Sequence, residues 1–78
     1  MTYYYWDLRV NSWFEDGGVD TLTHYPYCSE FSDEELAQKI EGATRREDLD
    51  DVVQSSIGGF NVYQCELGHY FAITEQYN

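Results

Sequence analysis

The chain has 78 residues and a formal net charge of −11, with fifteen acidic side chains against four basic ones. This charge excludes direct binding to nucleic acid, because phosphate contacts require clustered Lys and Arg, and it disfavours anionic membrane surfaces. Hydrophobic residues make up 42% of the chain and aromatic residues 18%, so we expect one small folded domain over residues 1–78 rather than a disordered segment.

The sequence has no apolar run long enough to span a membrane, and it lacks the basic start and apolar middle of a signal peptide. We therefore expect a soluble, cytoplasmic protein. Without a secretory signal, Cys28 and Cys65 are expected as reduced thiols more than as a disulfide, which stays open. Neither they nor His24 and His69 show metal-ligand spacing, so we expect no metal and no cofactor.

The N-terminal segment predicts a β-hairpin. Aromatic and β-branched residues from Tyr3 to Val10 indicate a strand. A turn at 15–18 (Glu-Asp-Gly-Gly) leads into a weaker edge strand over Val19–Tyr25, which Pro26 should end because proline cannot donate to a ladder. The charged residues indicate which face of the first strand is exposed. Asp7 and Arg9 should point to solvent, and the core face should carry Tyr4, Trp6, Leu8 and Val10.

Two capping patterns predict two short helices. The run Ser-Asp-Glu-Glu at 32–35 should begin a helix over Asp33–Glu41, and Thr-Arg-Arg-Glu at 44–47 a second one over Arg45–Ser55. Each helix has only a narrow apolar stripe. Because isolated helices this short are marginal in water, both should pack on a sheet.

The C-terminal segment predicts a second hairpin, with strands over Phe60–Glu66 and His69–Glu75 joined by a two-residue loop at 67–68. This register pairs Val62 with Ile73. The expected fold is α+β: a four-stranded antiparallel sheet in the order ββααββ, with both helices on one face. The expected core is Trp6, Leu8, Leu36, Ile40, Leu49, Val53, Phe60, Val62, Phe71 and Ile73.

Acidic residues concentrate between Glu30 and Asp51, which holds nine of the fifteen. Helix capping and solubility explain part of this charge, but a small domain needs a net charge of only about 2 to 8 for solubility. The excess predicts a basic protein partner, because a surface of one sign steers a complementary surface into encounter. Calcium loops space their ligands around a glycine turn, which this run lacks. The predicted partner-binding residues are Glu34, Glu41, Glu47, Asp48, Asp50 and Asp51.

No catalytic motif is present, so we do not expect an enzyme. Neither His24 nor His69 has a Ser or Cys neighbour in a nucleophile motif. A second candidate interface is a set of tyrosines on the sheet face that two helices would leave uncovered, since tyrosine is a frequent hot-spot residue. These are Tyr3, Tyr5, Tyr63 and Tyr70.

In size, acidity and α+β pattern the chain resembles the small DNA-mimic inhibitors of bacteriophages, of the anti-CRISPR and antirestriction types. The resemblance rests on overall charge, with the acidic block and Asp7, Glu15, Asp16 and Asp20 standing in for phosphates, and on no sequence motif. It implies an inhibitor that binds a basic nucleic-acid-binding surface of a defence complex and blocks DNA binding, in the host cell cytoplasm if a phage encodes it. Two alternatives remain: an immunity or antitoxin-like protein that neutralises a basic nuclease or toxin, and a plain protein-interaction module.

Overall fold

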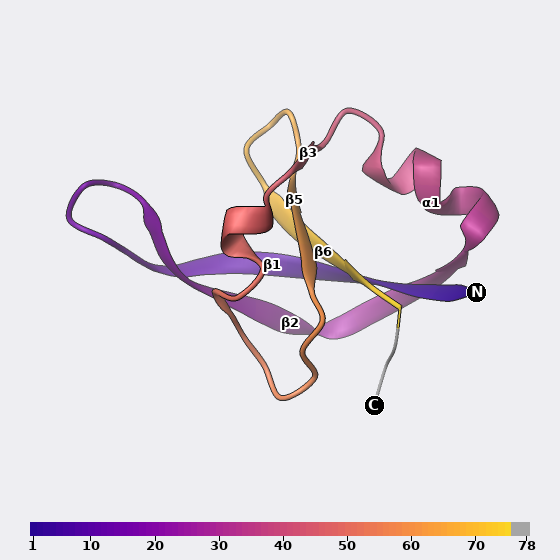
Figure 1. Ribbon diagram of the computed structural model, residues 1–78, viewed down its shortest axis with the longest axis horizontal. Coiled ribbons are helices and arrows are strands. Elements are labelled where there is room, and N and C mark those ends of the chain that lie inside the picture. The colour runs from indigo at the N-terminus through magenta and orange to yellow at the C-terminus, as the bar shows by residue number, and fades with distance from the viewer. Residues whose placement is uncertain (76–78) are drawn as a thin grey trace.

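A long N-terminal hairpin is the framework on which the other elements assemble (Figure 1). The computed structural model describes residues 1–75, without the side chains of Tyr27 and Cys28. The hairpin consists of β1 (Thr2–Trp13) and β2 (Val19–Ser32), both longer than predicted. Its turn is the expected one: the Phe14 N–H donates to the Gly18 carbonyl at 2.8 Å, and Gly17 has a φ of +93°, which glycine adopts without strain.

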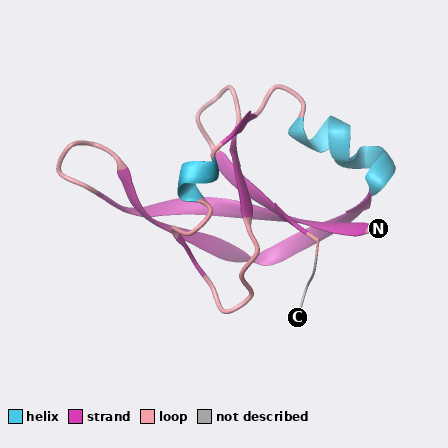
Figure 2. Ribbon diagram, viewed as in Figure 1, coloured by secondary structure: helices cyan, strands magenta, loops and turns pink. Residues whose placement is uncertain are grey.

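Within residues 1–75, six strands form one mixed sheet in the order β3-β5-β6-β1-β2-β4. The strands after the hairpin are β3 (Thr44–Arg45), β4 (Val53–Gln54), β5 (Asn61–Gln64) and β6 (Tyr70–Thr74). All pairs are antiparallel except β2 with β4, which is parallel. The α+β class is therefore confirmed, but the four-stranded antiparallel ββααββ arrangement is wrong (Figure 2).

Pro26 does not end the second strand. Trp6 lies opposite Cys28 and Leu8 lies opposite His24, so two steps along β1 face four steps along β2. The surplus residues of β2 form a bulge that contains Pro26. A bulge leaves residues out of the ladder, so a proline without an N–H is tolerated there.

The first predicted helix is present, and the second is absent. α1 covers Asp33–Ile40, although its Ser32 makes no side-chain capping hydrogen bond. Instead of a helix over Arg45–Ser55, the chain forms β3, a single 3₁₀ turn η1 (Glu47–Leu49) and β4. Pairing with β5 overrides the capping pattern here: Arg45 lies opposite Tyr63, and the Arg46 N–H donates to the Val62 carbonyl at 2.8 Å.

The second hairpin is present, but its register differs from the prediction by one residue. The Cys65 N–H donates to the His69 carbonyl at 2.9 Å, and Gly68 has a φ of +89°. The loop thus has three residues, 66–68, instead of two. Val62 consequently pairs with Ala72, not with Ile73, and a slip of one residue moves a whole side-chain set to the other face.

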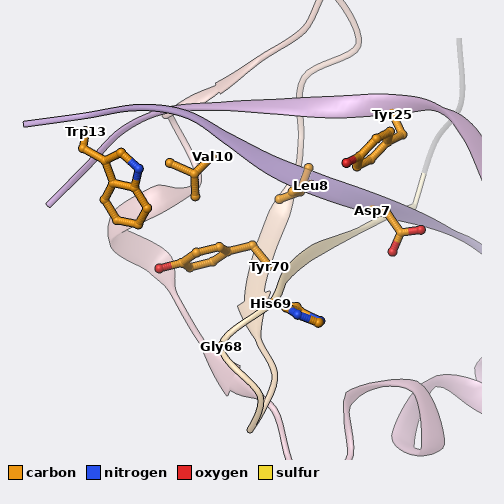
Figure 3. A pocket seen from close by; sticks show the side chains of 8 residues that line it. All are labelled: Asp7, Leu8, Val10, Trp13, Tyr25, Gly68, His69 and Tyr70. Atoms are coloured by element: carbon orange, nitrogen blue, oxygen red, sulfur yellow. The ribbon is translucent and has the colours of Figure 1, made fainter. Parts of the chain in front are cut away.

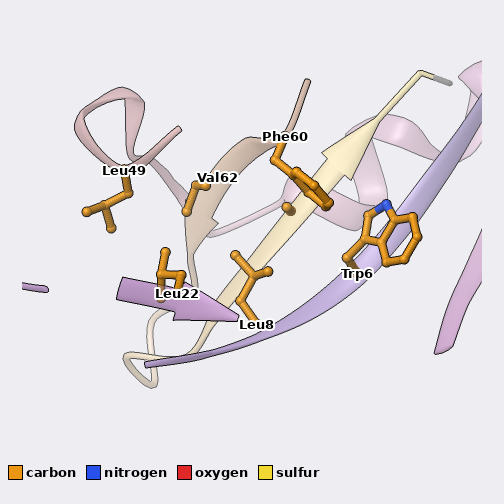
Figure 4. Packing of buried hydrophobic residues seen from close by; sticks show 7 residues of the cluster. Trp6, Leu8, Leu22, Leu49, Phe60 and Val62 are labelled. Atoms are coloured by element: carbon orange, nitrogen blue, oxygen red, sulfur yellow. The ribbon is translucent and has the colours of Figure 1, made fainter. Parts of the chain in front are cut away.

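Both faces of the sheet are therefore hydrophobic. The cluster on one face, in which Leu49 from η1 packs on the sheet (Figure 4), is formed by Trp6, Leu8, Leu22, Leu49, Phe60, Val62 and Ala72. The cluster on the other face is formed by Phe31, Phe71 and Ile73, and the half-buried Leu36 and Ile40 of α1 pack against it. The two helical elements thus cover opposite faces, which corrects the prediction that both lie on one.

Seven of the ten predicted core residues are buried, and the other three, Leu36, Ile40 and Val53, are only half-buried. The prediction missed Leu22, Phe31 and Ala72. Ala72 was expected on the uncovered face, and the register slip turns it into the core, whereas Phe31 lies in the part of β2 beyond its predicted end. Asp7 and Arg9 point to solvent as expected.

Replacing Phe71 tests the second cluster. Its ring is 6% exposed and stacks on Tyr5 and Tyr63 at centroid distances of 5.1 and 5.5 Å. We expect Phe71→Ala to lower the free energy of unfolding by about 3 to 5 kcal/mol, measured by urea unfolding. Phe14→Ala is the matched control, because Phe14 is 57% exposed and its loss should cost no more than about 0.5 kcal/mol. Equal midpoints for the two variants would contradict the assignment.

Candidate functional site

The folded surface is strongly acidic. Fourteen of the fifteen carboxylate side chains are exposed, and the exception is Asp50. Of the four basic side chains, Arg9 and Lys39 are exposed, whereas Arg45 and Arg46 are half-buried. Almost all of the negative charge in the sequence is therefore exposed to solvent, where it can act on an approaching molecule.

Asp50 takes part in an ion pair and a set of hydrogen bonds that stabilise the fold. Its two oxygens accept hydrogen bonds from Arg45 Nη1 and Nη2 at 2.7 and 2.6 Å, and Oδ1 also accepts from the Val62 N–H at 2.9 Å. Arg45 Nη1 in turn donates to the Val62 carbonyl at 3.1 Å. The guanidinium lowers the pKa of Asp50, its hydrogen bonds being the largest cause. This bidentate pair fixes the segment after β3 to β5.

Asp48 is held by the neighbouring arginine. Arg46 Nη2 donates to Asp48 Oδ2 at 2.9 Å, and this contact lowers the pKa of the carboxyl. The same guanidinium donates to Gln64 Oε1 at 2.6 Å and lies 5.8 Å from the centroid of the Tyr70 ring. Because the Asp48 side chain is 63% exposed, the ion pair adds little stability and leaves the carboxylate accessible.

The predicted partner-binding residues do not form one surface. Glu34 lies in α1 and Glu41 caps its C-terminus, whereas Glu47 and Asp48 lie in η1 and Asp50 and Asp51 follow it. The two elements pack on opposite faces of the sheet. Four of these residues are exposed and, within residues 1–75, take part in no ion pair: Glu34, Glu41, Glu47 and Asp51.

The predicted tyrosine face is also divided. Tyr3, Tyr5 and Tyr63 pack around the α1 cluster and Tyr70 packs on the opposite one, and all four are half-buried rather than exposed. The Lys39 ammonium lies 5.8 Å from the Tyr5 ring centroid. Burial and the nearby Asp7 carboxylate raise the pKa of Tyr5. Most of this set therefore holds α1 in place instead of forming a free interface.

Among the described residues, no histidine or cysteine side chain belongs to a cluster that could hold a metal ion. His24 stacks on Phe60 and meets the edge of Trp6, which is a packing role. Within the part of the chain that the structure describes, no group of three or more His, Cys, Asp and Glu side chains converges. Cys65 is a free thiol, and the side chain of Cys28 lies outside the described residues.

A notch beside β1 is a concave feature that sequence reasoning missed (Figure 3). β6 pairs with β1 only from Tyr4 to Asp7, so within the described residues no strand pairs with this edge of β1 beyond that point. The resulting pocket has a volume of about 550 Å³, within the roughly 300 to 1,000 Å³ typical of ligand sites. The notch is lined by Asp7, Leu8, Val10, Trp13, Tyr25, Gly68, His69 and Tyr70.

The signal for this notch was the placement of two large aromatics, Trp13 and Phe14, just before a tight turn. Trp13 is 59% exposed and Tyr25 is 45% exposed, which is unusual for rings of this size. Trp13 lies at one end of the notch and Asp7 at the other, with Val10, Leu8 and Tyr70 between them (Figure 3).

None of the helices in the described residues is long and apolar enough to cross a membrane. Comparison with protein-family models, with curated proteins and with solved structures gives no match for this chain. Functional inference therefore depends on the charge distribution and on the notch.

The ion pair between Arg45 and Asp50 makes a pH-dependent contribution to stability. The pKa of Asp50 is lowered in the folded state, so the stabilisation is complete above the unfolded value of about 3.9 and is lost as the pH falls through the folded value. We expect Asp50→Asn to lower the free energy of unfolding by about 1.5 to 3 kcal/mol at pH 7. The difference from the parent protein should shrink as the pH falls below about 4.

Asp51→Asn is the control, because Asp51 is exposed and adjacent in sequence. Asp51→Asn should change the free energy of unfolding by no more than about 0.5 kcal/mol at pH 7 and at pH 3. Urea titrations at pH 7 and pH 3 measure both variants. A loss for Asp50→Asn that is the same at both pH values would contradict the role of the ion pair.

Proposed function

We propose that this protein is an acidic inhibitor that binds the basic, nucleic-acid-binding surface of another protein and keeps DNA from that surface. The supporting observation is the imbalance of exposed charge, with fourteen exposed carboxylates against two exposed cationic side chains. Arg45 and Arg46 neutralise only Asp50 and Asp48, within the fold. Such a surface attracts clustered Lys and Arg and repels phosphate.

The mode of action is competition for the same cations. A DNA-binding groove holds Lys and Arg side chains that neutralise phosphates and release counterions, and carboxylates can occupy the same positions. The charge lies on both faces of the sheet and on its turns, so the inhibitor presents carboxylates in several directions. The resemblance to phage DNA-mimic inhibitors implies that the partner belongs to a defence complex such as a CRISPR or restriction system.

The proposal is tested by charge reversal that spares the structural pairs. Reversing Glu34, Glu41, Glu47 and Asp51 to Lys moves the formal charge from −11 to about −3 while Asp48 and Asp50 keep their arginines. A partner is first captured from bacterial lysate at low salt, released at high salt and purified. Its binding to a labelled DNA duplex is then measured against increasing inhibitor.

We expect the parent protein to displace the duplex, with an effect that falls steeply as salt is added, because exposed charges are screened over about 8 Å at physiological ionic strength. The fourfold reversal should restore DNA binding with an unchanged unfolding midpoint, and the matching Gln and Asn variant should give an intermediate result. A partner that holds the duplex and this protein together, or full inhibition by the fourfold variant, would overturn the proposal.

A further inference from the structure

We propose that the notch beside β1 binds an extended, Arg- or Lys-bearing segment of the basic partner, which adds to the sheet as a strand. This inference rests on the proposed function only for the basic character of the partner. It adds one defined binding site to an acidic surface whose charge alone does not locate the contact with the partner.

The backbone of β1 supplies the first half of the site. From Leu8 to Trp13, β1 pairs with β2 along one edge, and within the described residues no strand pairs with its other edge. Alternate N–H and C=O groups on that edge have no ladder partner, which is the arrangement that takes up an added peptide strand. Leu8 to Val10 is the regular part of this edge, because the register of β1 is irregular between Val10 and Trp13. An added strand therefore pairs with about three residues at Leu8–Val10, and Trp13 lies beyond this regular part.

Side chains supply the second half. Leu8 and Val10 form the floor of the notch, and the rings of Trp13 and Tyr70 stand beside it (Figure 3). The aliphatic stem of an Arg or Lys can pack on such a floor while its cationic head lies against an indole or phenol ring. The Asp7 carboxylate at the opposite end of the notch offers an ion pair to a second basic residue of the same segment.

Charge complementarity selects this occupant over a second copy of the chain. Glu15 and Asp16 lie in the turn beyond Trp13, and Asp7 lines the opposite end, so both ends of the notch are acidic. Another copy with a charge of −11 would be repelled, whereas a basic segment would be attracted. The hairpin of β1 and β2 projects beyond the other strands (Figure 1). The free edge of β1 is therefore accessible to a long polypeptide.

The test uses a capped seven-residue peptide of alternating Arg and Val, titrated at 150 mM salt and followed by NMR chemical shifts and by amide hydrogen exchange. We expect binding with slowed exchange of amides between Leu8 and Val10. Trp13→Ala should weaken binding about 3- to 30-fold, the range of one cation–π contact. Phe14→Ala, with an exposure of 57% against 59% for Trp13, should change it less than about twofold, because Phe14 does not line the notch.

Two control peptides separate strand addition from general attraction. A peptide with Glu in place of Arg should not bind, and one with a central Pro should bind at least about tenfold more weakly, because proline breaks the ladder. The inference is overturned if the Arg peptide does not bind at millimolar concentration, if the Pro peptide binds equally well, if both Ala variants weaken binding equally, or if exchange at 8–10 is unchanged. Dimerisation in sedimentation experiments that Trp13→Ala abolishes would also overturn it, since a second copy would then occupy the notch.

Both Ala variants keep the net charge of −11, so this experiment does not alter the quantity on which the proposed function rests. If the fourfold charge reversal abolishes inhibition while Trp13→Ala leaves partner binding intact, the notch is not the site and the acidic inhibitor stands. If the Arg peptide binds the notch as described but no partner is displaced from DNA, the proposed function fails and the peptide site stands.

Discussion

The alternation of side chains along β1 is the constraint on which the rest of the structure depends. β1 is paired on both sides near its start, where Trp6 and Leu8 join one hydrophobic cluster and the alternating residues Tyr3 and Tyr5 pack against the other. A sheet with two hydrophobic faces needs two covers. α1 supplies one and η1 with its flanking loops supplies the other, which is why the acidic middle of the chain is drawn to opposite sides of the molecule.

The first hairpin and α1 could be predicted from the sequence, because a glycine turn and a periodic segment with acidic residues in its first turn act through local physics. The second helix could not. Its capping pattern at 44–47 competed with the pairing of Thr44 and Arg45 on β5, and with the bidentate bond from Arg45 to Asp50. The strand pairing joins segments distant in sequence, which a local pattern does not encode. The register of the second hairpin turned on whether its loop has two residues or three, and that single choice moved Phe71 and Ile73 to the other face.

The sequence predicted that the candidate site is acidic, but it did not predict where the acidic residues lie relative to one another. Composition predicted an acidic surface, and the exposure of nearly all carboxylates agrees with that. It could not separate carboxylates that hold the fold, such as Asp50, from those that are free to meet a partner, such as Asp51 beside it. The notch was hidden for a related reason: it exists because β6 is too short to cover all of β1, and the relative lengths of paired strands emerge only when the whole sheet is assembled.

The order of the strands also bears on redox chemistry. Cys28 lies in β2 and Cys65 follows β5, and β1 and β6 run between them. Three steps across a sheet amount to roughly 14 Å, whereas a disulfide requires Cα atoms within about 7 Å. The backbone positions of these two residues are therefore too far apart for a disulfide within one molecule. Folding draws no stability from oxidation, and the same structure should form in glutathione-rich cytosol and in an oxidising solution.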